Sequence, residues 1–153
     1  MSALDFDQVV DQCHLALGEL GKGNPEPVKA LFSHRVDVSA AGGFGGVMLG
    51  WAQVAKNTEF AASRFQDRQV PIFENVVKYA THDLGYIVEI ERYEAKVGER
   101  EDMARVGLRS TSIFRLEDGA WKLVHRHGDP IVSIQEADSV ILKQISPKNP
   151  KSL

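Results

Sequence analysis

The hydrophobic residues change their period once along this chain, and that change most constrains what it can fold into. Over residues 5–20 and 51–65, apolar residues recur at the three- and four-residue spacing of an amphipathic helix. A shorter helical pattern over residues 25–34 begins with proline, which fits the first turn of a helix. Beyond residue 67 apolar and polar residues alternate, as in strands with one buried face. Helices that precede a run of strands predict an α+β domain.

The second part of the chain predicts an antiparallel sheet, because short polar turns separate its strands. The expected strands span residues 70–81, 84–97, 103–117 and 120–129. Asp118 and Gly119 are a strong signal for a two-residue hairpin, since such a turn needs positive φ. A short strand over residues 35–39 precedes a glycine-rich loop over residues 41–50. That loop lacks the Gly-Lys-Ser/Thr ending of a phosphate-binding loop, so we expect a flexible lid or a close backbone approach.

The two hairpin turns predict which side chains share a face of the sheet. Counting back from Asp118-Gly119, and from a turn centred on residues 98–101, pairs the strands residue by residue. The pairs expected on the inner face are Phe114 with Leu123, Ser112 with His125, Ser110 with His127, Tyr86 with Phe114, and Arg92 with Leu108. Glu89, Glu91 and Arg109 are then expected on the outer face. The inner face should be apolar near the last turn and polar toward its other end.

Length and composition are those of one globular domain: 153 residues, of which 43% are hydrophobic and 25% charged. A net charge of −3, with no block of lysine and arginine, argues against a nucleic-acid partner. No apolar run approaches the ~20 residues of a membrane span, and the first residues are acidic where a secretory signal is basic. We therefore expect a cytoplasmic protein without a membrane partner. Its one cysteine, Cys13, is expected to be a buried, unreactive thiol.

Two segments carry a resemblance to a known family. Residues 43–51, before the third expected helix, and residues 110–130, across the last hairpin, resemble nuclear-transport-factor-2-like domains of the SnoaL-like and ketosteroid-isomerase-like kind. The last hairpin is also similar to that of the calcium/calmodulin-dependent kinase association domain. The resemblance implies a cone, in which a strongly bent antiparallel sheet wraps around about three N-terminal helices and one central pocket. It also implies a homodimer through the convex face of the sheet.

The resemblance covers the chain as far as Pro130, so we expect a domain over residues 1–130 and a C-terminal tail over residues 131–153. The tail is expected to be partly helical or extended. Its apolar residues, which a docking helix could use, are Val140, Ile141, Leu142 and Ile145.

The family's catalytic patterns match this chain unequally. A ketosteroid isomerase has a carboxylate base on the loop after its first short strand and a tyrosine on its first helix. Here Ser39 lies nearer the base position than Asp37, and the first expected helix has no tyrosine, so steroid isomerase activity is not expected. In SnoaL-like cyclases an acidic residue that follows a histidine near the end of the last strand acts as acid or base. His127 and Asp129 resemble that pair.

The end of the last expected strand holds the strongest candidates for chemistry. His125, His127 and Asp129 alternate with other residues, so a strand places them on one face, which the register identifies as the pocket side. Histidine exchanges protons near neutral pH, and a neighbouring carboxylate orients it. We therefore assign His127 and Asp129 as the candidate acid/base pair. The alternative is that each histidine only hydrogen-bonds the serine opposite it.

A wider set of residues is expected to contact a ligand in the pocket. Its members are His125, Ser110, Ser112, Arg92, Tyr86, Trp51 and Asp37. The His-x-His-x-Asp run could also ligate a metal, but no further histidine, cysteine or acidic cluster is near it in sequence. We expect neither metal nor cofactor. Two functions stay open: a cofactor-independent lyase or isomerase acting on a small organic substrate, and a non-catalytic ligand-binding or assembly module.

Overall fold

The computed structural model describes residues 4–143 of the chain, and its three α-helices precede the four long strands, as the hydrophobic period predicted. The elements in order are α1 (Phe6–Gly21), α2 (Glu26–Leu31), β1 (Ser39–Ala41), β2 (Met48–Leu49), α3 (Trp51–Ser63), β3 (Phe65–Gln66), β4 (Ile72–Ala80), β5 (Leu84–Val97), β6 (Ala104–Glu117), β7 (Ala120–Asp129) and the short 3-10 helix η1 (Ala137–Val140). None of the helices in this range is long and apolar enough to cross a membrane.

Local signals at the helix ends explain where α1 begins. The Asp5 side chain accepts a hydrogen bond from the Gln8 backbone N–H at 2.8 Å, and the Gln8 side chain accepts one from the Asp5 backbone N–H at 2.9 Å. This reciprocal pair satisfies two backbone donors that a helix start would otherwise leave without partners. Asp5 and Gln8 thus fix the residue at which α1 begins.

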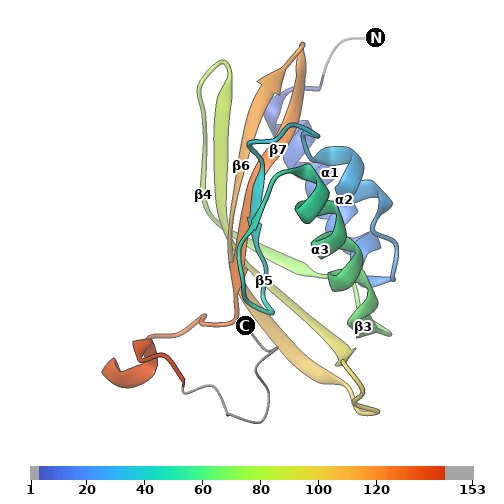
Figure 1. The fold of residues 1–153 in the computed structure, drawn as a ribbon, viewed down its shortest axis with the longest axis vertical. Helices are drawn as coiled ribbons and strands as arrows, with labels where there is room; N and C mark the ends of the chain where they lie inside the picture. The colour runs from blue at the N-terminus through green and yellow to red at the C-terminus, as the bar shows by residue number, and fades with distance from the viewer. Residues whose placement is uncertain (1–3, 144–153) are drawn as a thin grey trace.

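One strongly bent sheet holds the strands together, and α1, α2 and α3 pack on its concave side (Figure 1). The strand order is β2-β1-β7-β6-β5-β3, with β4 also paired to β5. The long pairs β4–β5, β5–β6 and β6–β7 are antiparallel, whereas the short β1 runs parallel to β7. The expected α+β cone is confirmed, with one parallel pair added to the antiparallel sheet.

The core joins α1 to the middle of the sheet. Val9 and Cys13 of α1 are 2% and 1% exposed, and they pack in one cluster with Ile87, Phe114 and Leu123 of the sheet. Full burial of an aliphatic or aromatic side chain of this kind contributes about 1.5–3 kcal/mol. This cluster fixes the helices against the concave face.

The register of the last hairpin changes halfway along it. Near the turn the pairs are those predicted, including Phe114 with Leu123. Beyond them the register shifts by one residue, and Ile113 pairs with His125 while Thr111 pairs with His127. A β-bulge of this kind adds one residue to one strand and exchanges the faces of all that follow. The prediction that His125 and His127 face the pocket is therefore wrong.

The register between β5 and β6 also differs from the prediction by one residue. Arg92 pairs with Gly107, and Leu108 pairs with Glu91. The observed pairs have residues 98–101 at their centre, whereas the predicted pairs are displaced from that centre by one residue, and this displacement exchanges the two faces. Glu89 and Glu91 face the helices and are 1% and 2% exposed, although the counted register had placed them outside.

The segment after β7 returns along the outer face of the sheet. A Cβ built on Gly107 would lie 3.5 Å from Cγ1 of Val132, so this part of the tail contacts β6. Val140, Ile141 and Leu142, which the docking-helix expectation named, are exposed. Ile145, the fourth residue of that expectation, lies outside the described residues.

A pair of glycines tests the register of β5. Gly85 faces inward, and a Cβ there would lie 2.6 Å from Cε2 of the Phe6 ring, whereas a Cβ on Gly18 of α1 would meet nothing within 4 Å. We expect Gly85→Ala to destabilise the protein by about 1–3 kcal/mol through overpacking. Gly18→Ala should stabilise it by up to about 1 kcal/mol, since alanine favours helix. Urea unfolding measures both, and a neutral Gly85→Ala would contradict the inward register.

Candidate functional site

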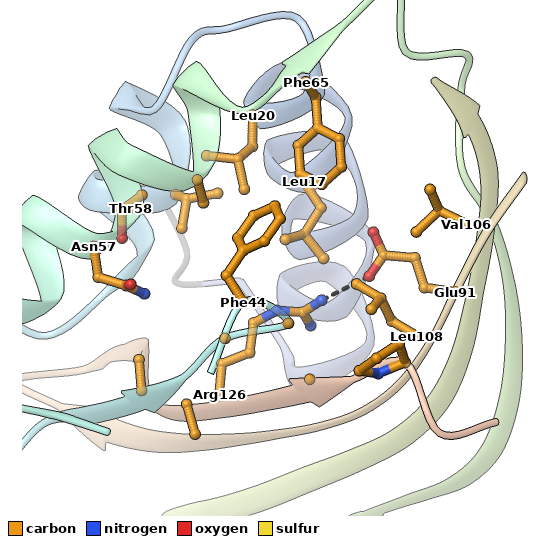
Figure 2. Close-up of a pocket in the computed structure, with 18 of the residues that line it drawn as sticks. Leu17, Leu20, Phe44, Asn57, Thr58, Phe65, Glu91, Val106, Leu108 and Arg126 are labelled. Carbon is orange, nitrogen blue, oxygen red and sulfur yellow. Dashed lines mark hydrogen bonds and ion pairs between the residues drawn. The ribbon is translucent and has the colours of Figure 1, made fainter. Parts of the chain in front are cut away.

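A cavity of about 230 Å³ lies between the helices and the concave face of the sheet (Figure 2). Its walls come from α1, α2, α3, the loop that follows β1, and strands β5, β6 and β7. Most of its lining is apolar, including Leu17, Leu20, Phe44, Phe65, Val106 and Leu108. An apolar concavity with a few polar groups is the usual form of a small-molecule site.

The polar groups of the cavity are concentrated around one carboxylate, Glu91 of β5. Its Oε1 accepts a hydrogen bond from Nη2 of Arg68 at 2.6 Å, and its Oε2 accepts one from Nη2 of Arg126 at 2.7 Å. All three residues line the cavity, and Figure 2 shows the contact between Arg126 and Glu91. The side chains of Arg68, Glu91 and Arg126 are 3%, 2% and 15% exposed. Charges removed from water to this extent are stable only when paired and hydrogen-bonded.

The backbone before Arg68, the ring of Tyr93 and the space beside Gly21 together determine the position of the Arg68 side chain. It follows Asp67, whose φ of 54° turns the chain sharply between β3 and β4. Its guanidinium carbon lies 3.8 Å from the centroid of the Tyr93 ring, a cation–π contact. A Cβ on Gly21 would lie 2.0 Å from Cδ of Arg68, so only glycine at position 21 leaves room for this side chain. Its Nε atom is fully buried and has no hydrogen-bond partner within residues 4–143.

Arg126 reaches the cavity because of the β7 bulge. It pairs with Ser112 across the sheet, and its Nη1 donates to Oγ of Ser112 at 3.1 Å. Ser112 is itself fully buried. The hydrogen bonds to Ser112 and to Glu91 together fix the orientation of the Arg126 guanidinium.

Tyr93 lines the cavity with a phenol ring that contacts Arg68. Burial raises the pKa of its phenol to about 12, with smaller effects from the neighbouring Arg68 and Glu91 charges. At neutral pH the phenol is therefore protonated and can donate a hydrogen bond. Tyr93 lies on the same face of β5 as Glu91, two residues along the strand.

A second buried carboxylate, Glu89, lies close to the cavity but is not part of its lining. Nε2 of His14 lies 2.8 and 2.9 Å from the two carboxylate oxygens of Glu89. The His14 ring stacks on Phe73 with centroids 4.0 Å apart. Glu89 is thus paired with α1 and ties the first helix to β5.

The glycine-rich loop contributes Gly42, Gly43 and Phe44 to the cavity wall. Phe44 lines the cavity and contacts Phe60 and Phe65, with ring centroids 5.8 and 5.6 Å apart. Gly45 and Gly46 after it have φ of 94° and 77°, values that favour glycine. The close backbone approach expected for this loop is found at Gly43, where a Cβ would lie 3.2 Å from Cδ2 of Leu108.

The candidate acid/base pair lies on the convex side of the sheet and does not line the cavity. His127 is 52% exposed, and its Nε2 lies 3.4 Å from Oδ2 of Asp129. Nε of Arg109 donates to Oδ1 of Asp129 at 2.7 Å. Burial opposes ionisation of Asp129, but the hydrogen bonds from Arg109 and from the Ile131 backbone hold its pKa below the ordinary value. Asp129 is thus engaged in an ion pair at the rim of the sheet.

His125 makes a contact to the neighbouring strand instead of to the cavity. Its Nδ1 lies 2.8 Å from Oγ of Ser39 in β1. Burial lowers the pKa of His125, and the nearby His127 lowers it further. A histidine that hydrogen-bonds a serine agrees with the structural alternative, although the partner is Ser39 and not Ser112.

The structure separates the remaining predicted ligand contacts. Ser110 and Ser112 are buried on the concave side, beneath the cavity lining. Tyr86 and Arg92 lie on the convex face, where Arg92 pairs with Glu74 at 2.8 Å. Trp51 stacks on His34, with centroids 3.8 Å apart, and Asp37 accepts two hydrogen bonds from Arg115. None of these side chains is among those that line the cavity in the described range.

Burial also raises the pKa of the Cys13 thiol to about 12, which agrees with the unreactive thiol expected. Over residues 4–143, no group of three or more histidine, cysteine, aspartate or glutamate side chains is arranged to hold a metal ion.

Sequence reasoning missed Arg68, Glu91 and Arg126 as site residues. In β5 the alternation leaves the choice of face open, and the face with Val88 and Ile90 is the more apolar one at its centre. The register counted from the turn at residues 98–101 places that face inside. The bulge that turns Arg126 inward has no marker in the local sequence, since no glycine or proline lies between Trp121 and His127.

Comparison with known proteins places this geometry in context. A family model described as "SnoaL-like domain" matches residues 8–133. No curated protein matches the sequence. Among solved structures, a nuclear transport factor 2-like superfamily protein from Salmonella enterica aligns with a TM-score of 0.71 at 15% identity, over 86% of this chain and 92% of that one.

Two further solved structures show the same fold. A ketosteroid isomerase-like protein from Erwinia carotovora aligns with a TM-score of 0.69 at 10% identity, covering 83% of this chain and 94% of that one. A protein named for the calcium/calmodulin-dependent protein kinase type II association domain, from Thiobacillus denitrificans, has a TM-score of 0.62 at 16% identity, with 88% and 99% covered. At these identities the likeness concerns the fold alone.

Two arginine–glutamate pairs of similar length but different burial test the energetics of the cavity. We expect Arg68→Met to destabilise the protein by about 1.5–3 kcal/mol, because it removes a hydrogen bond between charged groups that is shielded from water. Arg92→Met is the matched control, since its pair with Glu74 joins side chains that are 53% and 60% exposed. That change should cost no more than about 1 kcal/mol. Equal losses in urea unfolding would contradict the buried role of Arg68.

Proposed function

Since this chain belongs to the SnoaL-like domain family, and since one fold serves many functions, we propose a function from the cavity itself: the domain binds one small organic molecule between α1, α3 and the sheet. The observation that carries the proposal is the combination of an apolar lining with one cluster of hydrogen-bonding groups. That combination lets a ligand bury its apolar body while its polar end is oriented.

The size of the cavity limits the ligand. Its volume of about 230 Å³ is below the roughly 300–1,000 Å³ of most ligand pockets. A ligand of one ring or a short chain is therefore favoured over a steroid-sized molecule. This agrees with the departures of the sequence from the ketosteroid isomerase pattern.

Binding is better supported than acid/base catalysis of the lyase or isomerase type. The titratable side chains of the lining, within the described residues, are Arg68, Glu91, Tyr93 and Arg126. Both oxygens of Glu91 accept hydrogen bonds from guanidinium groups, so neither is positioned to take a proton from a ligand. The expected pair of His127 and Asp129 lies outside the cavity. The proposal is therefore of a binding module, and turnover of a bound molecule would overturn that part of it.

Filling the cavity tests the proposal. 1-Aminonaphthalene is an uncharged aromatic probe whose fluorescence increases in apolar surroundings. We expect it to bind the protein with one-to-one stoichiometry, and to lose that binding in Ala61→Phe, because Ala61 of α3 lines the cavity. Ala52→Phe is the control, since Ala52 is exposed on the same helix and does not line the cavity. Binding that survives Ala61→Phe but not Ala52→Phe would place the probe elsewhere.

We also propose that two copies associate through the convex face of the sheet. That face carries exposed apolar side chains, among them Ile72, Tyr79 and Tyr86, which are 72%, 59% and 37% exposed. Exposed apolar patches of this kind mark interaction surfaces. Glu91, which the sequence had placed in this interface, lies on the other face, and Gly107 is covered by Val132.

A cytoplasmic location stays a prediction.

Light scattering at micromolar concentration tests the association. We expect the mass of a dimer for the parent protein and of a monomer for Tyr86→Glu, because a charge in an apolar interface is costly to desolvate. Leu15→Glu, at a 73% exposed position on α1, should leave the dimer intact. A monomeric parent would contradict the proposal.

A further inference from the structure

The charges that line the cavity do not balance. Arg68 and Arg126 contribute two positive charges, and Glu91 contributes one negative charge. No other charged side chain in the described part of the chain lines this cavity. The cavity wall therefore carries an excess of one positive charge in apolar surroundings, where an unbalanced charge is costly.

Many of the guanidinium donors are also unused. Each guanidinium has five N–H donors. Within residues 4–143, Arg68 uses one of them, to Glu91, and Arg126 uses two, to Glu91 and Ser112. Arg68 is covered by Tyr93 and Gly21, and its Nε has no partner among the described residues. Arg126 is the more accessible of the two, at 15% exposed.

Glu89, the other buried carboxylate of β5, makes no contact with the two cavity arginines. It lies on the same face of β5, but both of its oxygens are within hydrogen-bond distance of Nε2 of His14, at 2.8 and 2.9 Å. It is also not among the residues that line the cavity. Its side chain is therefore hydrogen-bonded to α1 and to neither of the cavity arginines.

We propose that the molecule bound in the cavity is a small organic monoanion with a carboxylate that binds Arg126. This inference rests on the proposed binding function and adds the chemical class of the ligand. The carboxylate neutralises the excess charge and uses the remaining Arg126 donors, while the rest of the molecule contacts the apolar wall formed by Leu20, Phe65 and Leu108. The planar guanidinium fork matches the geometry of a carboxylate.

The charge count favours a carboxylate over a phosphate. One negative charge brings the lining to neutrality, whereas a phosphate dianion would leave a buried negative excess. The apolar lining also offers few partners for the additional phosphate oxygens.

A matched pair of compounds tests the inference in the 1-aminonaphthalene assay. Cyclohexanecarboxylate and cyclohexanecarboxamide have nearly the same size and shape, but only the first is charged at pH 7. We expect the carboxylate to displace the probe at a concentration at least about tenfold lower than the amide requires. This is the effect of gaining one charge-assisted hydrogen bond. The measurement uses low salt, since screening weakens the attraction.

Two substitutions should change the preference in opposite directions. Arg126→Gln should remove it, because the accessible positive charge is lost. Glu91→Gln should increase it, because the two guanidinium groups lose their internal partner. His127→Gln, on the same strand but 52% exposed on the convex face, is the control and should leave the preference unchanged.

The outcomes separate the two proposals. If neither the probe nor either compound binds, the proposed binding function fails. If the probe binds but the acid and the amide displace it equally, the function stands and the carboxylate inference is wrong. That comparison uses the parent protein, so it decides the matter even if a variant does not fold, and far-UV circular dichroism checks the variants.

Discussion

The hydrogen-bonded ion pairs of Glu91 with Arg68 and Arg126 are the interaction on which the rest of this structure depends. They join the turn between β3 and β4, the middle of β5, and the bulged part of β7, three segments that are far apart in sequence. In a charge group with side chains at most 15% exposed, Glu91 is the essential member, because its removal would leave two buried guanidinium charges without compensation. Gly21, Tyr93 and Ser112 are then explained as its supports: glycine leaves space for Arg68, the tyrosine ring covers it, and the serine orients Arg126.

The same group gives the cavity its chemical character. The helices and the bent sheet enclose a volume with mostly apolar walls, and the ion pairs occupy one wall (Figure 2). Two guanidinium groups on one carboxylate leave a positive excess and unused donors, so the site is suited to bind an anion more than to abstract a proton. Under the proposed binding function, the SnoaL-like fold carries in this chain a site whose selectivity follows from charge and size.

Most of the fold could be predicted from the sequence, whereas the site could not. The helical periods, the capping pair of Asp5 and Gln8, and the Asp118-Gly119 turn are local signals, and local signals decide where elements begin and end. The faces of β5 and of the end of β7 depend instead on the exact pairing across one turn and on one bulge. Either feature shifts the register by a residue, and a shift of one exchanges every side chain between the faces. His127 was therefore expected inside and Glu91 outside, and the structure has them the other way round.

Nuclear magnetic resonance of the arginine side chains tests the central claim most directly. Addition of cyclohexanecarboxylate to the protein labelled with nitrogen-15 should shift the guanidinium resonances of Arg126, with smaller changes at Arg68. The resonances of Arg115, which is paired with Asp37 and Glu117 outside the cavity, should not move. Shifts confined to arginines outside the cavity, or guanidinium signals of Arg68 and Arg126 that are averaged by free rotation as in an exposed side chain, would contradict a buried, anion-binding ion-pair cluster.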